Sequence, residues 1–318
     1  MKQSVAFIIP TRNRCPELKR LLESISRQAF VPDQIILVDS SDSPVDALCR
    51  EFPGLPLDYQ HVIHPSLTAQ RNTGLRRLKN DIRLVCFLDD DMVFEEGAVG
   101  QMMAFWEKAG EDVGGAVCNI INEKPPTRLV HLKRIFSSGT KERGIVLRSG
   151  FNTLVCPADE TRFVQWIFGG GTVWRRKVFE EFLFDEWFDG DGFCEDLDFS
   201  YRVGKKYKLA VVAQAKVQHL SPSVGQRRNN FEFGVSQVCN RYYFVRKHPE
   251  LSKPLCLWGS VGQMVENFVR GLATADKGYL VRAAGNGVGF WKLNEINRPF
   301  PRSREKIFLS GKTAGLNS

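Results

Sequence analysis

The stretch Leu84-Val85-Cys86-Phe87-Leu88, followed directly by Asp89-Asp90-Asp91, decides the fold prediction for this chain. The apolar run is short and rich in β-prone side chains, so it predicts a buried strand. Three adjacent carboxylates at the exit of a strand raise one another's pKa, and a divalent metal ion would relieve that repulsion. In open α/β sheets, ligands bind just past the carboxyl ends of the strands. The stretch therefore favours a metal-bound phosphorylated ligand, with a solvated acidic turn as the alternative.

The chain on both sides of this strand alternates between strand and helix signals. Short apolar runs mark the strands, and apolar residues repeated every three or four positions mark the helices. Continuous apolar strands joined by helices are typical of a parallel sheet covered on both faces. We therefore predict an α/β fold with a mostly parallel sheet sandwiched by helices. The predicted strands span residues 5–9, 35–38, 57–63, 84–88, 116–121 and 210–217, and the predicted helices span 16–28, 46–52, 69–78, 97–108, 172–182 and 196–206.

The pattern changes after His219. Residues 231–248 and 256–272 have helical spacing, and no clear strand follows them. The charge changes as well, because residues 241–318 contain 13 Lys and Arg but only 5 Asp and Glu, whereas the first 240 residues are close to neutral. We expect a boundary near residue 220, between an α/β domain of residues 1–220 and a mainly helical, basic extension of residues 221–318.

The composition is that of a soluble globular protein, with 43% hydrophobic and 25% charged residues. The eight cysteines are scattered and form no Cys-x-x-Cys pair, which favours a reducing cytoplasm over a disulfide scaffold or a zinc site. The N-terminus lacks the features of a signal peptide, and no run of about 18 apolar residues predicts a transmembrane helix. The expected location is therefore the cytoplasm.

The extension has two possible partners besides its own domain. Residues 255–272 form a helix pattern with a wide apolar face that includes Trp258, in a segment of basic charge. Such a helix usually packs on its own domain, but it also suits peripheral contact with an anionic membrane at its inner face. Basic charge alone is weak evidence for nucleic-acid binding, and the chain has no recognition motif for it, so no nucleic-acid partner is expected.

Eight motifs occur at the predicted strand exits and helix starts, and their order resembles that of the family 2 glycosyltransferases over about residues 4 to 220. They are Pro10-Thr11-Arg12-Asn13-Arg14, Val38-Asp39-Ser40-Ser41-Asp42, Arg71-Asn72-Thr73-Gly74-Leu75, Asp89-Asp90-Asp91, Phe168-Gly169-Gly170-Gly171, Phe184-Asp185-Glu186, Glu195-Asp196-Leu197-Asp198 and Val217-Gln218-His219. This resemblance implies the Rossmann-like glycosyltransferase type A fold, a nucleotide-diphospho-sugar donor, a divalent metal and inversion at the anomeric carbon. Their joint order is more specific than any single motif.

The resemblance assigns a first group of residues to the nucleotide-sugar. Asp39 matches an acid that accepts a hydrogen bond from the base or ribose, although the family more often has Asp-Asp-Gly-Ser where this chain has Asp39-Ser40-Ser41-Asp42. A hydroxyl and a guanidinium suit ribose and phosphate oxygens. A glycine lets the backbone approach the sugar closely. The full set for the nucleotide-sugar is Thr11, Arg12, Asp39, Arg71, Asn72, Asp89 and Gly170.

The resemblance also assigns the metal and the catalytic base. Asp89 and Asp91 match the family Asp-x-Asp, with Asp91 as the direct ligand of Mn²⁺ or Mg²⁺, and His219 matches a position near the metal. Asp196 matches the general base, which takes the proton of the acceptor hydroxyl, and Glu195 beside it orients the acceptor or caps a helix. A charge-stabilised helix N-terminus is the structural alternative for this acidic pair.

The implied reaction is transfer of a sugar to a hydroxyl of a glycan or lipid-linked acceptor, in surface polysaccharide biosynthesis. One alternative is a sugar-nucleotide pyrophosphorylase, which would place a glycine-rich phosphate loop after the first strand, where this chain has Pro10-Thr11-Arg12-Asn13-Arg14. Another is a non-catalytic glycan- or nucleotide-binding module, which would be favoured by loss of Asp91 or Asp196. Neither the sugar, the base, the acceptor nor the linkage follows from these residues.

Overall fold

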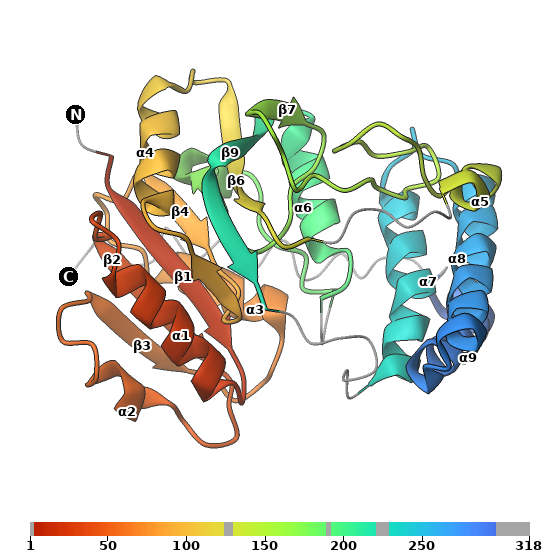
Figure 1. The fold of residues 1–318 in the computed structure, drawn as a ribbon, viewed down its shortest axis with the longest axis horizontal. Helices are drawn as coiled ribbons and strands as arrows, with labels where there is room; N and C mark the ends of the chain where they lie inside the picture. Colours follow the sequence, from red (N-terminus) through yellow and green to blue (C-terminus); the bar gives the residue numbers. More distant parts are fainter. Residues whose placement is uncertain (1–2, 124–129, 189–191, 221–228, 297–318) are drawn as a thin grey trace, which may run out of the picture.

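A computed structural model describes residues 3–123, 130–188, 192–220 and 229–296, and the ranges between and beyond them lie outside this description. Within the described residues, nine strands form one mixed sheet in the order β3-β2-β1-β4-β8-β6-β9-β5, with β7 paired to β9 (Figure 1). The strands are β1 (Val5–Thr11), β2 (Gln34–Asp39), β3 (Leu57–His61), β4 (Leu84–Phe87), β5 (Met92–Phe94), β6 (Val113–Ile120), β7 (Arg162–Val164), β8 (Thr172–Arg175) and β9 (Lys208–His219). The predicted α/β class is confirmed.

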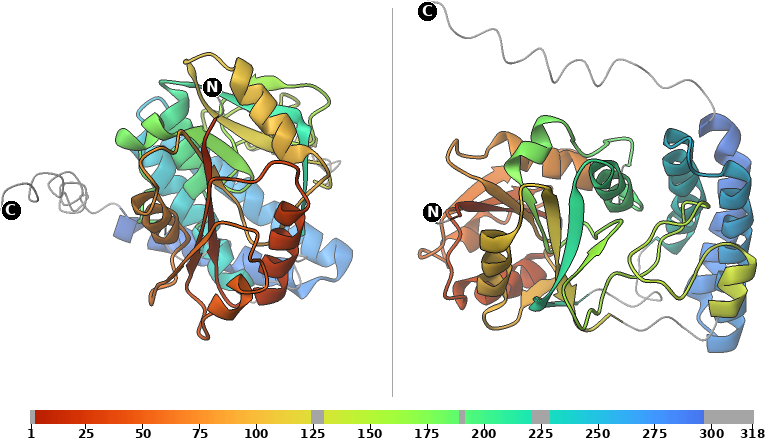
Figure 2. Two further views of the ribbon diagram at one scale, coloured as in Figure 1. Left: turned by 90° about the vertical axis from the view of Figure 1, so that its left-hand side faces the viewer. Right: turned by 90° about the horizontal axis from the view of Figure 1, so that it is seen from above.

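The first half of the sheet is parallel, as its apolar strands predict. β1 pairs with β2 and β4 on its two sides, and β2 pairs with β3, all in parallel register. Every residue of β1 and β4 is buried, because helices cover both faces of the sheet (Figure 2). The carboxyl ends of β1 and β4 therefore meet at one edge, which brings the Thr11 end of β1 beside the start of the Asp triplet.

The second half of the sheet departs from the sequence prediction at β8. Residues 172–182 were expected to be helical, and this expectation is wrong: they form β8 and then a 3₁₀ helix at Arg176–Glu180. β8 runs antiparallel to β4 and β6, so the sheet becomes mixed there. The residues Thr172, Val173 and Trp174 are β-branched or aromatic, and all three are buried between the neighbouring strands. Tertiary pairing thus outweighs the helical spacing.

The helices of the α/β domain agree closely with their predicted positions. Each predicted helix except the one at 172–182 is present, with ends shifted by a few residues. They are α1 (Cys15–Ser26), α2 (Asp46–Cys49), α3 (Leu67–Arg76), α4 (Ala98–Lys108) and α6 (Glu195–Gly204).

The described part of the extension consists of long helices at one end of the sheet (Figures 1 and 2). They are α7 (Asn230–Lys247), α8 (Lys253–Thr274) and α9 (Lys277–Ile296), and the short α5 (Val130–Ile135) packs against α8. The sequence predicts α7 and α8 but not α9, whose Ala283-Ala284-Gly285-Asn286-Gly287 run is poor in helix-forming apolar spacing. The expected boundary near residue 220 adjoins residues 221–228, outside the described ranges. Among the described helices, none is both long enough and apolar enough to cross a membrane.

A buried carboxylate joins α6 to α7. Asp198 is fully buried, its Oδ1 lies 2.8 Å from Lys247 Nζ, and its Oδ2 accepts a 2.9 Å hydrogen bond from Arg202 Nε. Lys247 also contacts Asp185 at 2.7 Å. Burial alone would raise the pKa of Asp198, but Arg202, His248 and Lys247 hold it well below its ordinary value. The extension is therefore tied to the α/β domain by charge as well as by packing.

Asp198→Asn should lower the free energy of unfolding by roughly 3 kcal/mol at pH 7. This value is near the lower end of the range for breaking a buried ion pair, because Lys247 would still pair with Asp185. A depressed folded-state pKa gives stability that is complete above the unfolded-state pKa of about 3.9 and is lost as pH falls toward the folded-state value. The difference between wild type and variant should therefore shrink below about pH 4. Denaturant unfolding across pH measures this.

The matched control is Asp112→Asn, because Asp112 pairs with Lys208 at 2.7 Å while 57% of its side chain is exposed. Solvent screens this exposed pair, so its loss should leave the free energy of unfolding nearly unchanged. Equal losses in the two variants would contradict the role given to Asp198.

Candidate active site

The Asp triplet lies at the carboxyl end of β4 and is neutralised from the loop after β1. Asp90 Oδ2 accepts a 2.8 Å hydrogen bond from Thr11 Oγ1, and Arg14 Nη1 lies 2.8 Å from Asp90 Oδ1. The other Arg14 nitrogen, Nη2, lies 3.0 Å from Asp91 Oδ2. Burial raises the pKa of Asp90 to about 7, against the opposing effect of Arg14. The sequence predicts no role for Arg14, whereas the structure shows that it contacts two of the three acids.

His219 reaches the same cluster from the end of β9. β5 and β9 pair antiparallel with Met92 opposite His219, which brings the imidazole beside the residue before Met92. His219 Nε2 lies 3.0 Å from Asp91 Oδ1. Burial alone would raise the pKa of Asp91, but His219 and Arg14 hold it below its ordinary value. Burial opposes protonation of His219, but Asp91 raises its pKa above the ordinary value.

Arg71 connects the Asp triplet to the start of α6. Its side chain is 1% exposed, with Nη2 at 3.0 Å from Asp89 Oδ1 and Nη1 at 2.5 Å from Glu195 Oε1. The ring of Phe184 lies 5.2 Å from the guanidinium carbon, a cation–π contact. The buried Arg71, itself predicted to contact the donor, thus joins Asp89, another predicted donor-site residue, to Glu195, a predicted catalytic residue.

The glycine run before β8 leaves room for these charges. A Cβ on Gly169 would lie 2.6 Å from Arg71 Nη2, and a Cβ on Gly170 would lie 2.4 Å from Asp89 Oδ2. Both distances are far below van der Waals contact, so any side chain here would displace the ion pairs. Gly170 was predicted to let the backbone approach a sugar, and its close neighbour in this structure is the Asp89 carboxylate.

The N-terminus of α6 carries the acidic pair. Glu195 is 5% exposed, and burial raises its pKa, although Arg71 works in the opposite direction. Asp196 is half-buried, and its Oδ1 accepts a 2.7 Å hydrogen bond from the Leu197 N–H. Burial raises the pKa of Asp196 above its ordinary value, and the Leu197 N–H and Arg71 oppose that shift. A carboxylate with a raised pKa that is partly open to solvent is suited to accept a proton.

Asp39 is completely buried and holds the loop after β2. Its Oδ1 accepts a 2.8 Å hydrogen bond from the Ser41 N–H, while Oδ2 accepts from the Val45 N–H at 3.0 Å and from Tyr59 Oη at 2.7 Å. Burial alone would raise its pKa, but these hydrogen bonds from Ser41 and Tyr59 hold it below the ordinary value. Asp39 therefore shapes the loop at this edge of the sheet, as a turn acid does.

Asn72 and Arg12 have different surroundings from the central cluster. The Asn72 side chain donates to Phe184 O at 2.9 Å and to Glu186 Oε1 at 3.0 Å, and it accepts from the Phe184 N–H at 3.1 Å. It thereby fastens the segment around Phe184. The Arg12 side chain is 51% exposed at the rim of the same edge, 4.0 Å from Asp42.

An aromatic pair joins the segment before α6 to α7. Trp187 stacks on Tyr243 of α7 with ring centroids 3.6 Å apart and remains 38% exposed. Tyr243 Oη donates to Asp185 Oδ2 at 3.0 Å. Trp166, by contrast, is buried and donates from Nε1 to Thr153 O at 2.9 Å. The sequence gives no signal that α7 returns to this segment.

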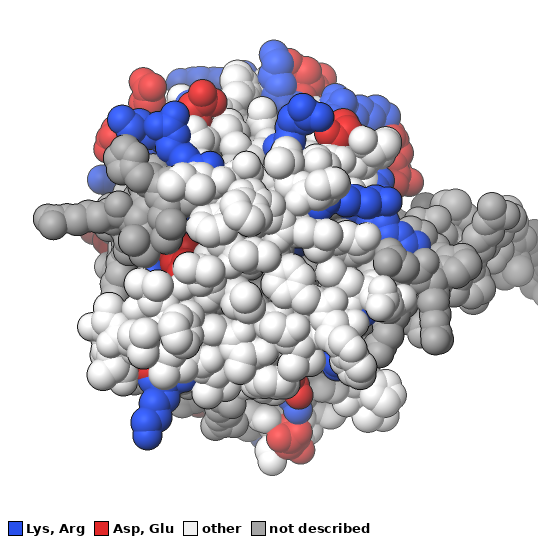
Figure 3. All heavy atoms as spheres, turned by 90° about the vertical axis from the view of Figure 1, so that its right-hand side faces the viewer, with Lys and Arg blue, Asp and Glu red and all other residues white. Residues whose placement is uncertain are grey.

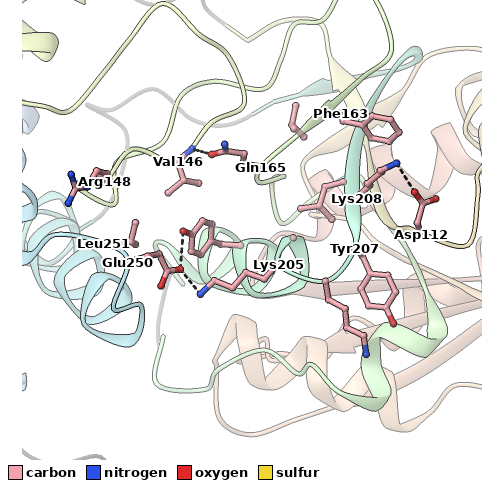
Figure 4. Close-up of a pocket in the computed structure, with 15 residues that line it drawn as sticks. Asp112, Val146, Arg148, Phe163, Gln165, Lys205, Tyr207, Lys208, Glu250 and Leu251 are labelled. Atoms are coloured by element: carbon pink, nitrogen blue, oxygen red, sulfur yellow. Dashed lines mark hydrogen bonds and ion pairs between the residues drawn. The ribbon is translucent and has the colours of Figure 1, made fainter.

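Figure 4 shows a cavity of about 700 Å³, and none of the carboxylates of the candidate site lines it. Gly204 and Lys208 line it, at the ends of α6 and β9 that are opposite to Glu195 and His219. Two ion pairs lie within its lining, Lys205 with Glu250 at 2.5 Å and Lys208 with Asp112 at 2.7 Å. The chemistry assembled around Arg71 therefore marks the candidate site better than the size of a cavity does.

The donors near the Asp triplet suit a divalent cation in type. Carboxylate oxygens are the ligands that Mg²⁺ prefers, and an imidazole nitrogen added to them suits Mn²⁺. Asp91 and His219 are already in contact, and Asp89 is 31% exposed at the cluster's open side. Within the described residues, no group of three or more His, Cys, Asp or Glu side chains is placed to hold a metal ion. The residue types fit a metal, while Arg14 and His219 engage Asp91 in this structure.

Comparison with known proteins identifies relatives of this chain. The model of a family described as "Glycosyl transferase family 2" matches residues 6–182. A protein of Bacillus subtilis (strain 168) named "Uncharacterized glycosyltransferase YwdF" is 28% identical over 229 residues, which cover 71% of this chain and 77% of that protein. The sequence-based prediction of the family is confirmed.

Solved structures share the fold at low identity. The mannosyltransferase PcManGT from Pyrobaculum calidifontis, solved in complex with GDP-Man and Mn²⁺, has a TM-score of 0.58 and 15% identity, over 92% of this chain and 88% of that one. S. aureus TarS 1-349 has a TM-score of 0.54 and 14% identity, over 85% of this chain and 74% of that one. At these identities, the matches establish the fold alone.

Proposed function

Because the chain belongs to glycosyl transferase family 2, and is therefore a glycosyltransferase, we propose that it is an inverting, metal-dependent enzyme acting on a nucleotide-diphospho-sugar. The observation that carries this proposal is the buried Arg71, which joins the Asp89 end of β4 to the Glu195 start of α6. Donor-binding and acceptor-activating groups must lie side by side for a single displacement at the anomeric carbon. A cation shared between the two carboxylates is a direct way to hold them there.

The donor is proposed to lie at the carboxyl ends of β1, β2 and β4. Thr11, Arg12 and Asp89 line this edge, with Arg71 behind them, and a guanidinium there suits phosphate oxygens. Asp39 and Asn72 are proposed to act beside the nucleotide mainly by holding the loop after β2 and the segment at Phe184. Because Gly170 has no side chain, the backbone can pass close to the Asp89 carboxylate.

Asp91, Asp89 and His219 are proposed to hold Mn²⁺ or Mg²⁺. Bound there, the ion would supply Lewis-acid stabilisation of the departing diphosphate. Arg14 already balances the charge of Asp90 and Asp91, and its guanidinium is placed to bind phosphate oxygens as well. The Mn²⁺ in the PcManGT structure supports the choice of ion for this fold.

Asp196 is the proposed base. Its raised pKa keeps it a competent proton acceptor, and its half-buried position at the start of α6 leaves it open to an acceptor hydroxyl. Glu195 is engaged by Arg71 and is proposed to orient the site. The hydroxyl attacks the anomeric carbon as its proton passes to Asp196, and the bond to the nucleotide diphosphate breaks on the opposite face, which inverts the configuration.

The acceptor is proposed to be a glycan or a glycolipid in surface polysaccharide biosynthesis. The exposed Trp187, stacked on Tyr243, offers an aromatic face beside α6, and such faces commonly stack on sugar rings. The proposed location remains the cytoplasm, and the division into a donor-binding domain and a helical extension remains part of the proposal.

Asp196→Asn should reduce kcat by about 10²–10⁴-fold, because the amide keeps the size of the side chain but cannot take the proton. Donor Kd and the thermal midpoint should change little, since Asn also tolerates a helix N-terminus. Steady-state kinetics with donor titration measure both on one protein. Near-normal turnover in a stable Asp196→Asn protein would show that Asp196 is not the base. The matched control is Asp46→Asn, at the start of α2.

Removal of divalent ions with a chelator should abolish transfer and weaken the binding of UDP or GDP, and Mn²⁺ or Mg²⁺ should restore both. Asp91→Ala should remove Mn²⁺ binding by calorimetry and make nucleotide affinity independent of the ion, because it deletes the carboxylate that His219 contacts. Asp112→Ala should leave Mn²⁺ binding unchanged. Full-rate transfer in excess chelator would show that the metal proposal is wrong.

A further inference from the structure

A buried polar network lies between the helices of the extension, while several large apolar side chains of α8 and α9 are exposed. Asn267 Nδ2 donates to Gln237 Oε1 at 3.2 Å and to Asn286 Oδ1 at 2.8 Å, which places a polar network between α7, α8 and α9. These three side chains are 6% exposed or less. Helices that meet only water on their outer side usually show the reverse arrangement.

Close backbone packing accompanies this polar interior. A Cβ on Gly234 of α7 would lie 2.2 Å from Arg282 O, and a Cβ on Gly285 of α9 would lie 2.1 Å from Phe231 O. Large apolar side chains therefore have little room between α7 and α9. Small residues and side-chain hydrogen bonds between helices are features of helix packing in an apolar surrounding.

The large apolar side chains on the outer sides of α5, α8 and α9 form a surface that we call the apolar face. Figure 3 shows this side of the molecule with a broad area that lacks charged residues. The large exposed apolar residues described on α5, α8 and α9, with exposed fractions from 43% to 79%, are Ile135, Trp258, Phe268, Val269, Leu272, Val281 and Trp291. Because they come from the sides of α8 and α9 as well as α5, the face runs along the helices. An apolar area of this kind on a protein surface marks an interaction site.

The exposed charged side chains described on the three helices that carry the apolar face are basic, and we call them the basic border; Figure 3 also shows Asp and Glu residues around the uncharged area. Arg134, Lys253, Lys277 and Lys292 are exposed on α5, α8 and α9. Glu266 is only 16% exposed and contacts Arg270 at 2.6 Å and Lys133 at 3.4 Å. Of the side chains described on these three helices, no acidic one is exposed.

We propose that the apolar face docks in the plane of an anionic lipid bilayer, with α8 and α9 lying along the surface. The apolar side chains would enter the acyl boundary, the two tryptophans would sit at headgroup level, and the basic border would meet anionic headgroups. A second copy of the chain fits less well, because a two-fold contact would bring the basic border against itself. The proposal depends on this surface alone and holds whatever acceptor the enzyme uses.

Vesicle flotation of the full chain tests the docking. The protein should bind vesicles of phosphatidylcholine mixed with phosphatidylglycerol and bind pure phosphatidylcholine weakly. Leu272→Glu combined with Trp291→Glu should lower partitioning at least about tenfold, since two large apolar side chains would be replaced by carboxylates that resist entry into the acyl boundary. Lys253→Glu combined with Lys277→Glu should remove the preference for the anionic vesicles.

Ile63→Glu is the matched control, because Ile63 is 84% exposed on the α/β domain, remote in sequence from these helices. It should leave vesicle binding unchanged, and the affinity of every variant for UDP or GDP should match the wild type, which separates this test from the proposed function. Failure of the wild type to bind anionic vesicles would overturn the proposal. Vesicle binding by the Leu272→Glu and Trp291→Glu double variant equal to that of the wild type would also overturn it. So would a wild-type dimer, detected by light scattering, that only this double variant disrupts, because the apolar face would then be a dimer interface.

Discussion

The buried guanidinium of Arg71, held between Asp89 and Glu195, is the interaction on which the rest of the site depends. Removing ions of this size from water costs several kcal/mol each, and only close pairing offsets that cost. Asp89 follows β4 and Glu195 begins α6, so the pairing joins two elements that are more than 100 residues apart. The Gly169 and Gly170 backbone must pass within contact distance of the same charges, which excludes side chains at both positions.

A second layer of contacts keeps α6 in place. Asp198 pairs with Lys247 of α7, and Asn240 of α7 donates to Phe193 O at 2.9 Å, just before Glu195. The Trp187–Tyr243 stack joins the same two regions. The helical extension is thus part of the frame that positions the acidic pair, while its opposite side carries the apolar face. One set of helices can serve both the site and a membrane surface because its polar interior leaves the apolar residues outside.

The sequence predicts what depends on local pattern. The apolar strands, the helices of the α/β domain and the acids at strand ends follow from periodicity and charge, and the order of motifs is enough to recognise the family. β8 is missed because its residues 172–182 have helical spacing, and only pairing with β4 and β6 makes its first part a strand. α9 is missed because its glycines and asparagine serve packing against α7, which no local pattern records. The role of Arg14 is missed because nothing in the residues next to it in sequence shows that it contacts the Asp triplet.

The central claim is that the donor binds at the carboxyl ends of β1 and β4, against the charges that Arg71 organises. A crystal structure of the chain with Mn²⁺ and UDP or GDP tests it most directly. The account predicts the diphosphate beside Asp89 and Asp91, with Arg71 still between Asp89 and Glu195. Nucleotide bound instead in the cavity of about 700 Å³ at the far end of α6 would contradict it.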